Sequence, residues 1–456
     1  MRFLYLFHNR DIMTDIEFKC LERYMNRNML RWSPARIIAT AFSIVSFTGS
    51  ILLYLPISHM PGVQITYLDA LYTAVSAMCV TGLSIVDTAE AFNSFGQIIL
   101  AVLIQIGGLG VSTIGAGVLL VLGKKVGMKE RSLIHDTMNL DSYAGVVRFL
   151  KTLFATTVII ELIGAALSYS VFRRDYEPLE AFGLSLFHAI SSFNNAGLTI
   201  LSADRSMATY ADDPFMLLVT LALIFIGGLG FIVIRECWIK KFKWNKLTMH
   251  SRVSLFMSAL LLVGGAVLLK MTNDVSWVVA FFSSQSARSA GFEVFPFESW
   301  SPAGLLIMLV LMFIGTSTGS TGGGVRTSTI FALALGIRRV SMNKRAEAFN
   351  YSLPPYIFRK ASVVVFFAIT DIIVSTFILL LISPGLTLAE AFTEMFSAFT
   401  TVGLSLGTTS SLNEWGKLLS ILVMLTGRIG PITVATAWHY HEETRARYPN
   451  GNITVG

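Results

Sequence analysis

A short phrase that ends in glycine occurs four times along this chain, each time after an apolar stretch too short to cross a membrane. A longer apolar stretch precedes each short one, and another follows each phrase. Four copies of helix, short helix, glycine loop and helix predict four similar units in one polypeptide, arranged as the walls of a central pore. The copies end in Val80-Thr81-Gly82, Asn195-Ala196-Gly197, Ser289-Ala290-Gly291 and Thr401-Val402-Gly403.

The chain has 456 residues, of which 54% are hydrophobic and 14% charged, and this composition excludes a soluble protein. About 20 apolar residues span a hydrocarbon core of ~30 Å, and shorter runs favour re-entrant segments. We therefore expect an all-α membrane protein with eight transmembrane helices and four pore half-helices. The crossings are expected near 35–56, 97–122, 149–171, 215–234, 252–270, 303–337, 359–382 and 415–438, and the half-helices near 69–78, 180–193, 276–286 and 388–399.

This pattern also divides the chain into segments. They are a cytoplasmic N-terminal arm over 1–33, pore repeats over 34–123, 147–238, 250–340 and 357–440, and a C-terminal tail over 441–456. The arm mixes charged and aromatic residues, which is typical both of a helix on the inner membrane face and of a solvated extension.

The net charge of +7 follows the membrane topology and does not indicate nucleic-acid binding. Basic residues gather in the arm and in the loops near 124–131, 235–246 and 338–360, whereas the alternate loops contain few. Cytoplasmic loops are rich in Lys and Arg, so both termini are expected in the cytoplasm. The three cysteines match neither a disulfide framework nor a metal site.

The glycine loops have a physical reason to conduct cations. Non-helical backbone at membrane depth is tolerated only where protein buries it or water lines it. The C-terminus of a half-helix carries partial negative charge, and loop carbonyls can replace the hydration shell of an ion. Except for Arg288, the side chains beside the glycines are uncharged, which favours a backbone filter for monovalent cations but does not separate potassium from sodium. The alternative, close helix packing through small residues, is difficult to reconcile with four copies.

Each following stretch carries a second glycine mark, at Gly107, Gly227, Gly315 and Gly427. These marks favour tight packing or bending of the helix over a direct role in the pore. The third differs, because ten small residues follow one another inside the expected sixth crossing, and each glycine costs ~1 kcal/mol in a helix. Such a run predicts an intramembrane gate loop, with a fixed packing bend as the alternative. It reads Gly315, Thr316, Ser317, Thr318, Gly319, Ser320, Thr321, Gly322, Gly323, Gly324.

Arg428 lies in the expected eighth crossing, where a charged side chain costs ~2.5–3.5 kcal/mol near a helix centre. Hydrogen bonds to the carbonyl-rich gate loop would offset that cost, so we expect Arg428 to latch the loop. The alternative is a buried ion pair with Glu161 or Asp371.

Together, these motifs closely resemble the ion-conducting membrane subunit of bacterial Ktr potassium-uptake systems, within the Trk/Ktr/HKT superfamily. The resemblance extends over nearly all of the chain after about residue 33. It rests on the four phrases, on Phe187-His188-Ala189-Ile190, on the 315–324 run, on Gly427-Arg428-Ile429-Gly430-Pro431 and on the end of the chain from Arg447-Tyr448-Pro449 to Gly456.

The resemblance implies a potassium-selective filter at the four glycines, a gate at 315–324 and Arg428 as the partner of that gate. It also implies a homodimer in the bacterial plasma membrane, resting on a cytosolic ring of nucleotide-binding regulatory subunits, with potassium as the transported ion and no cofactor in this chain. Sodium is expected to influence activity. Arg326 stands where lysine is common, which leaves the charge but puts the details of gating in doubt.

Two other functions were weighed. A secondary transporter for a small organic solute also uses broken helices, but two related halves would then be expected. A membrane enzyme is disfavoured because the chain lacks a paired acidic motif, a His-Glu-x-x-His motif and a phosphate-binding loop.

Overall fold

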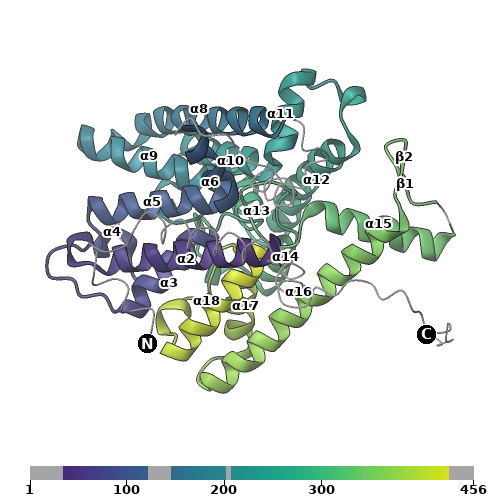
Figure 1. The fold of residues 1–456 in the computed structure, drawn as a ribbon. Coiled ribbons are helices and arrows are strands. Elements are labelled where there is room, and N and C mark those ends of the chain that lie inside the picture. The colour runs from purple at the N-terminus through teal and green to yellow at the C-terminus, as the bar shows by residue number, and fades with distance from the viewer. Residues whose placement is uncertain (1–33, 122–144, 202–206, 344, 431–456) are drawn as a thin grey trace, which may run out of the picture.

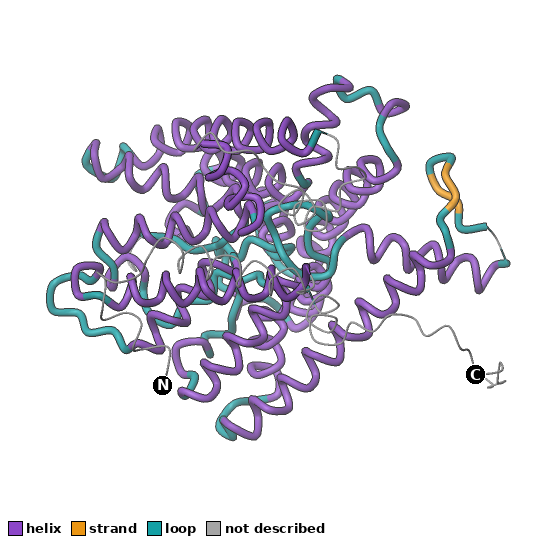
Figure 2. The backbone as a smooth tube through the Cα atoms, viewed as in Figure 1, coloured by secondary structure: helices purple, strands orange, loops and turns teal. Residues whose placement is uncertain are grey.

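Each quarter of the chain contains a long helix, a shorter helix, a glycine loop and another helix. The computed structural model describes residues 34–121, 145–201, 207–343 and 345–430. The arm at 1–33 and the tail at 441–456 lie outside the described residues. Figure 2 shows that the described chain is almost entirely helical, with a single pair of short strands.

The elements follow one another in a repeating order (Figure 1). The first quarter contains α2 (Pro34–Tyr54), η2 (Pro56–Ser58), α3 (Tyr67–Cys79), α4 (Thr88–Ala91), α5 (Ser94–Leu109) and α6 (Val111–Val121). The second contains α8 (Val146–Phe172), α9 (Pro178–Asn194), η4 (Met207–Tyr210), α10 (Pro214–Leu229), α11 (Phe231–Lys240) and η5 (Trp244–Lys246). The third contains α12 (Met249–Thr272), α13 (Trp277–Ser286), η6 (Phe297–Ser299), α14 (Pro302–Phe313), α15 (Thr327–Met342), β1 (Glu347–Ala348) and β2 (Tyr351–Ser352). The fourth contains α16 (Pro355–Ile382), α17 (Leu388–Thr400), η7 (Thr409–Ser411) and α18 (Glu414–Ile429).

The first helix of each quarter is long and apolar enough to cross a membrane. These four helices expose large apolar side chains on their outer faces, for example Ile159 on α8 and Phe366 on α16. By length and composition the described residues contain four such spans, or six if the bent pairs α5–α6 and α10–α11 are each one span. The chain is therefore a multi-pass membrane protein.

The short helices α3, α9, α13 and α17 occupy the interior, and they lie where the apolar pattern predicts half-helices. Three of them begin at a hydroxyl cap, since Thr66, Ser276 and Thr387 each accept a hydrogen bond from a backbone N–H of the first turn. The fourth, α9, begins instead with Pro178 in its first turn. Short sequence signals of this kind fix where each half-helix starts.

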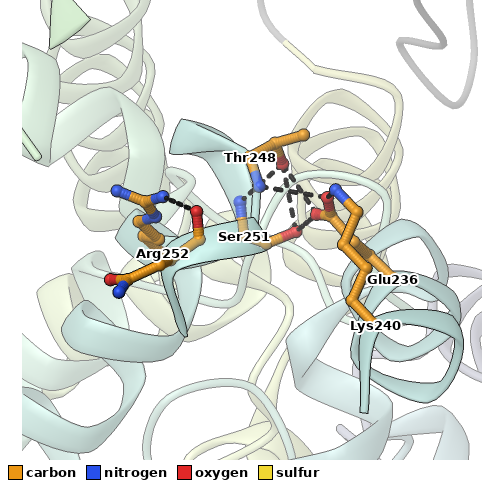
Figure 3. Close-up of polar contacts among 6 residues, drawn as sticks. Glu236, Lys240, Thr248, Ser251 and Arg252 are labelled. Carbon is orange, nitrogen blue, oxygen red and sulfur yellow. Dashed lines mark hydrogen bonds and ion pairs between the residues drawn. The ribbon is translucent and has the colours of Figure 1, made fainter. Parts of the chain in front are cut away.

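In the first two quarters, the helix that follows the glycine loop is bent. Between α10 and α11 the chain turns by 96° at Gly230, whose φ of +92° is accessible to glycine. A polar cluster then holds the corner between α11 and α12 (Figure 3). The carboxylate of Glu236 accepts hydrogen bonds from the Thr248 hydroxyl (2.7 Å), from the Ser251 hydroxyl and from Lys240. The sequence predicts this corner in the cytoplasm.

Candidate functional site

The four glycine phrases, far apart in the sequence, meet in space. The carbonyl oxygen of Ala196 faces Gly82, that of Ala290 faces Gly197, that of Val402 faces Gly291, and that of Thr81 faces Gly403. This order returns to its start, so the four loops form a closed ring in which each carbonyl touches the next glycine.

The ring leaves no room for a side chain at these positions. A Cβ atom built on each glycine would lie 2.6 Å (Gly82), 2.1 Å (Gly197), 1.9 Å (Gly291) or 2.4 Å (Gly403) from the neighbouring carbonyl oxygen. All four glycines also have positive φ, from +68° to +100°. Glycine is therefore required twice, for its backbone angles and for the close approach of the next loop.

Each loop is held by the short helix that precedes it. The backbone N–H of Gly82 donates to the Ser76 hydroxyl (3.1 Å), and that of Gly403 donates to the Ser397 hydroxyl (3.0 Å). In the other two loops the serine hydroxyl donates instead, from Ser191 to the Leu198 carbonyl (2.7 Å) and from Ser286 to the Phe292 carbonyl (2.7 Å). The ring is thus fixed from behind on all four sides.

Three uncharged oxygen atoms beside the ring have no hydrogen-bond partner among the described residues. They are the hydroxyl oxygens of Thr81 and Thr401 and the amide oxygen of Asn195, all fully buried. Buried polar atoms are almost always paired, so each needs a reason. Oxygen atoms of uncharged groups are ligands for a dehydrated monovalent cation.

The run from Gly315 to Gly324 is a loop between α14 and α15, as predicted. Its ends are joined by a hydrogen bond from the Gly315 N–H to the Val325 carbonyl (2.9 Å). Its middle lies against the glycine ring, where the Thr321 hydroxyl donates to the Phe193 carbonyl (3.1 Å) and the Gly323 N–H donates to the Ser289 hydroxyl (3.2 Å). The loop therefore contacts the ring through residues that come shortly before the glycines in the sequence.

Arg428 contacts this loop. Its guanidinium donates to the Thr321 carbonyl (2.5 Å) and to the Gly107 carbonyl. The acids considered as alternatives have other partners, since Glu161 accepts from Gln105 and Asn194, and Asp371 accepts from Thr426.

The expected eighth crossing over 415–438 extends past Gly430, where the described residues end. Within them, α18 ends at Ile429. The cause is Gly430, whose φ of +96° lies outside the helical region. Arg428 is thus in the last turn of α18, where a cation faces the negative end of the helix dipole.

Two further arginines hold the 315–324 loop through contacts that the sequence did not predict. Arg326 donates to the Gly322 carbonyl (2.6 Å) and to the Thr316 hydroxyl (3.2 Å). Arg288 is fully buried and donates to the Gly315 carbonyl (3.2 Å) and to the Ser258 carbonyl of α12 (3.4 Å). The only sign of these contacts in the sequence was position: Arg326 follows the 315–324 run, and Arg288 lies beside the third glycine phrase.

Two of the second glycine marks contact this loop or its partner Arg428 through their backbone. The Gly107 carbonyl accepts from Arg428, and the Gly228 carbonyl accepts from the Ser317 N–H (3.1 Å). A Cβ on Gly107, Gly227 or Gly427 would lie 1.8–1.9 Å from a carbonyl oxygen at the end of a short helix. The predicted close packing is therefore found, together with contacts to the gate loop.

Two cavities flank the ring and its loop. One, of about 380 Å³, is lined by the four ring glycines and by residues that follow them, including Glu293 and Glu298. The other, of about 530 Å³, is lined by the gate loop and by Arg326, Lys360 and Arg428. The two cavities thus have opposite charge, and the ring and the loop lie between them.

Glu293 is the titratable group of interest in the acidic cavity. Its side chain is exposed to the cavity, and the protein atoms around the cavity desolvate it, which raises the pKa of Glu293 to about 7. A hydrogen bond from the Phe297 backbone opposes the rise, and the charge of Glu298 adds to it. The charge on this wall therefore changes near neutral pH.

Comparison with known proteins agrees with this architecture. The profile of the TrkH family, described as cation transport protein, matches residues 16–252 and 245–445. The chain belongs to this TrkH family.

Several known proteins are similar to this TrkH family member over nearly their whole length. The chain is 35% identical to the potassium/sodium uptake protein NtpJ of Enterococcus hirae, with 93% of this chain and 98% of the relative covered. It is 34% identical to the Ktr system potassium uptake protein B of Bacillus subtilis, with 94% and 98% covered, and 34% identical to that of Vibrio alginolyticus, with 94% and 96% covered. These similarities place it among the KtrB-like subunits, which are transport proteins and not enzymes.

The fold agrees with a solved structure of the same family. The potassium transporter TrkH from Vibrio parahaemolyticus superposes with a TM-score of 0.70 at 20% identity, covering 88% of this chain and 85% of that one. At this identity the likeness concerns the fold alone.

Proposed function

We propose that this chain carries potassium ions across the plasma membrane of a bacterium, down their electrochemical gradient. The observation that carries the proposal is the closed ring of Gly82, Gly197, Gly291 and Gly403, with a backbone carbonyl beside each glycine. Carbonyl oxygens in such a ring can replace the water around a monovalent cation. The names of relatives that transport potassium support this ion.

The two residues before each glycine also belong to the proposed filter, because their backbone carbonyls lie in the same loops. The proposed gate is the 315–324 loop, latched by Arg428. Three arginines, Arg288, Arg326 and Arg428, hydrogen-bond to or beside this loop, and among the described residues none of their hydrogen-bond partners is a carboxylate. Uncompensated positive charge opposes the passage of cations, so the loop as described represents a closed state.

The expected topology and assembly belong to the same proposal. Four pore repeats contribute eight crossings, with both termini in the cytoplasm. The name of the Ktr system implies more than one component, which supports regulatory partners. The homodimer and the cytosolic ring of nucleotide-binding subunits are expected from the resemblance alone. The name of NtpJ supports an influence of sodium. No cofactor is expected in this chain, and no nucleic acid.

Growth of a potassium-uptake-deficient bacterium at low external potassium tests the function, with and without a regulatory subunit. We expect rescue by the wild type and loss of preference for potassium over sodium in Gly403→Ser, since that Cβ would lie 2.4 Å from the Thr81 carbonyl oxygen. Gly385→Ser is the matched control, because nothing lies within 4 Å of a Cβ there. The proposal would be refuted if the chain improved growth regardless of the external potassium concentration, or if it transported an organic solute instead.

A further inference from the structure

A carboxylate on the fourth short helix is buried behind the ring. Glu394 lies on α17 and is fully buried. The corresponding positions before the other three ring glycines hold Thr73, His188 and Phe282. The acid thus makes the fourth loop different from the other three.

Among the described residues, the hydrogen bonds that Glu394 receives come from the loop that follows Gly403. The hydroxyls of Ser405 (2.7 Å) and Thr408 (2.9 Å) donate to Oε2, and the hydroxyl of Thr409 (2.8 Å) donates to Oε1. A buried carboxylate is tolerated only when it is paired or richly hydrogen-bonded. Three hydroxyl donors fix both of its oxygens, and therefore they fix the loop as well.

This arrangement holds Gly403 from both sides. Before the glycine, Ser397 of α17 accepts the Gly403 N–H (3.0 Å); after it, Glu394 of the same helix holds residues 405–409. Ser405 and Thr409 also line the acidic cavity. One helix therefore sets the path of the fourth loop through the ring and into the cavity.

We infer that Glu394 is a positioning residue that sets the discrimination between potassium and sodium by fixing the fourth loop. The inference rests on the proposed function, since it concerns the same ring. Sodium needs its oxygen ligands closer than potassium does, so a loop free to move toward the ion admits sodium. Glu394 does not touch the ion, because it lies behind the loop and has no solvent exposure.

The test is ion selectivity in proteoliposomes, measured as potassium against sodium competition for rubidium uptake. Glu394→Gln keeps the size of the side chain but replaces one acceptor oxygen by an amide donor. We expect the preference for potassium to fall by about tenfold, the change that follows from losing one hydrogen bond to a charged group. Glu390→Gln is the matched control, because Glu390 lies one turn earlier on α17, is partly exposed and caps the helix start.

The outcomes separate a positioning role from a merely structural one. Reduced uptake with an unchanged potassium-to-sodium ratio, at equal amounts of folded protein, would overturn the inference. If Glu394→Gln does not fold, Thr409→Val removes one donor and leaves the carboxylate, and a smaller shift in the same direction is expected. A wild type that does not prefer potassium would instead refute the proposed function, independently of Glu394.

Discussion

Replacing Arg428 by glutamine tests the gate most directly. The guanidinium donates to the carbonyl of Thr321 in the gate loop and to that of Gly107 in α5. Only the bond to Thr321 is lost when the loop moves away from the ring. A hydrogen bond to a charged group contributes ~1.5–3 kcal/mol, so without it the ratio of closed to open gate falls roughly 10- to 150-fold. Glutamine can still donate one neutral bond, which places the expected change toward the lower limit.

Rubidium uptake into proteoliposomes without a regulatory subunit measures this change. We expect faster uptake by Arg428→Gln than by the wild type, and an intermediate rate for Arg428→Lys, which keeps the charge. Arg174→Gln controls for loss of an arginine elsewhere, because Arg174 pairs with Asp213 and is 61% exposed. Equal or slower uptake by Arg428→Gln at matched protein amounts would refute the latch.

Three further changes have defined outcomes. Gly291→Ala places a Cβ 1.9 Å from the Val402 carbonyl oxygen and should abolish selective uptake. Gly183→Ala is the control, because nothing lies within 4 Å of a Cβ there, and it should leave uptake unchanged. Similar uptake by both variants would contradict the ring. Because the pKa of Glu293 is raised to about 7, its carboxylate is charged above that pH and neutral below it. Uptake at low potassium should therefore fall as the pH on that side drops from 8 to 6, and Glu293→Gln should remove this dependence; a slope unchanged by the variant would exclude Glu293. Ser301→Ala removes the cap that accepts the Gly304 N–H and should cost about 1 kcal/mol, seen as a lower Tm in detergent; an unchanged Tm would show that the cap contributes little.

Much of this fold could be predicted from the sequence, because its signals are local. Apolar length predicts the long helices, and apolar runs too short to cross the membrane predict the short ones. The start of α14 follows from Ser301 and Pro302, a hydroxyl cap and a proline in the first turn. The gate loop follows from a run of small residues that cannot remain helical.

The remainder depends on contacts that leave no mark in the sequence. Carbonyl groups accept most of the hydrogen bonds around the gate, and every residue has one, so the role of Gly107 as an acceptor for Arg428 could not be inferred. Hydropathy reports the length of an apolar run but not its direction. The glycine marks predict packing or bending near Gly230, but neither the size of that turn nor the helix end at Gly430 could be inferred. The acceptors of Arg288, the carbonyls of Ser258 and Gly315, lie far from it along the chain and could not be inferred either.

The contact between Thr81 and Gly403 has a consequence for biogenesis. The two residues belong to the first and last quarters of one polypeptide, so the ring stays incomplete until the ribosome has made almost the whole chain. Until then, the first three loops lie in the bilayer as an incomplete ring, in which some polar backbone groups lack their final neighbour. Truncated products would therefore be leaky or unstable, and the cell gains by degrading them before they can dissipate its ion gradients.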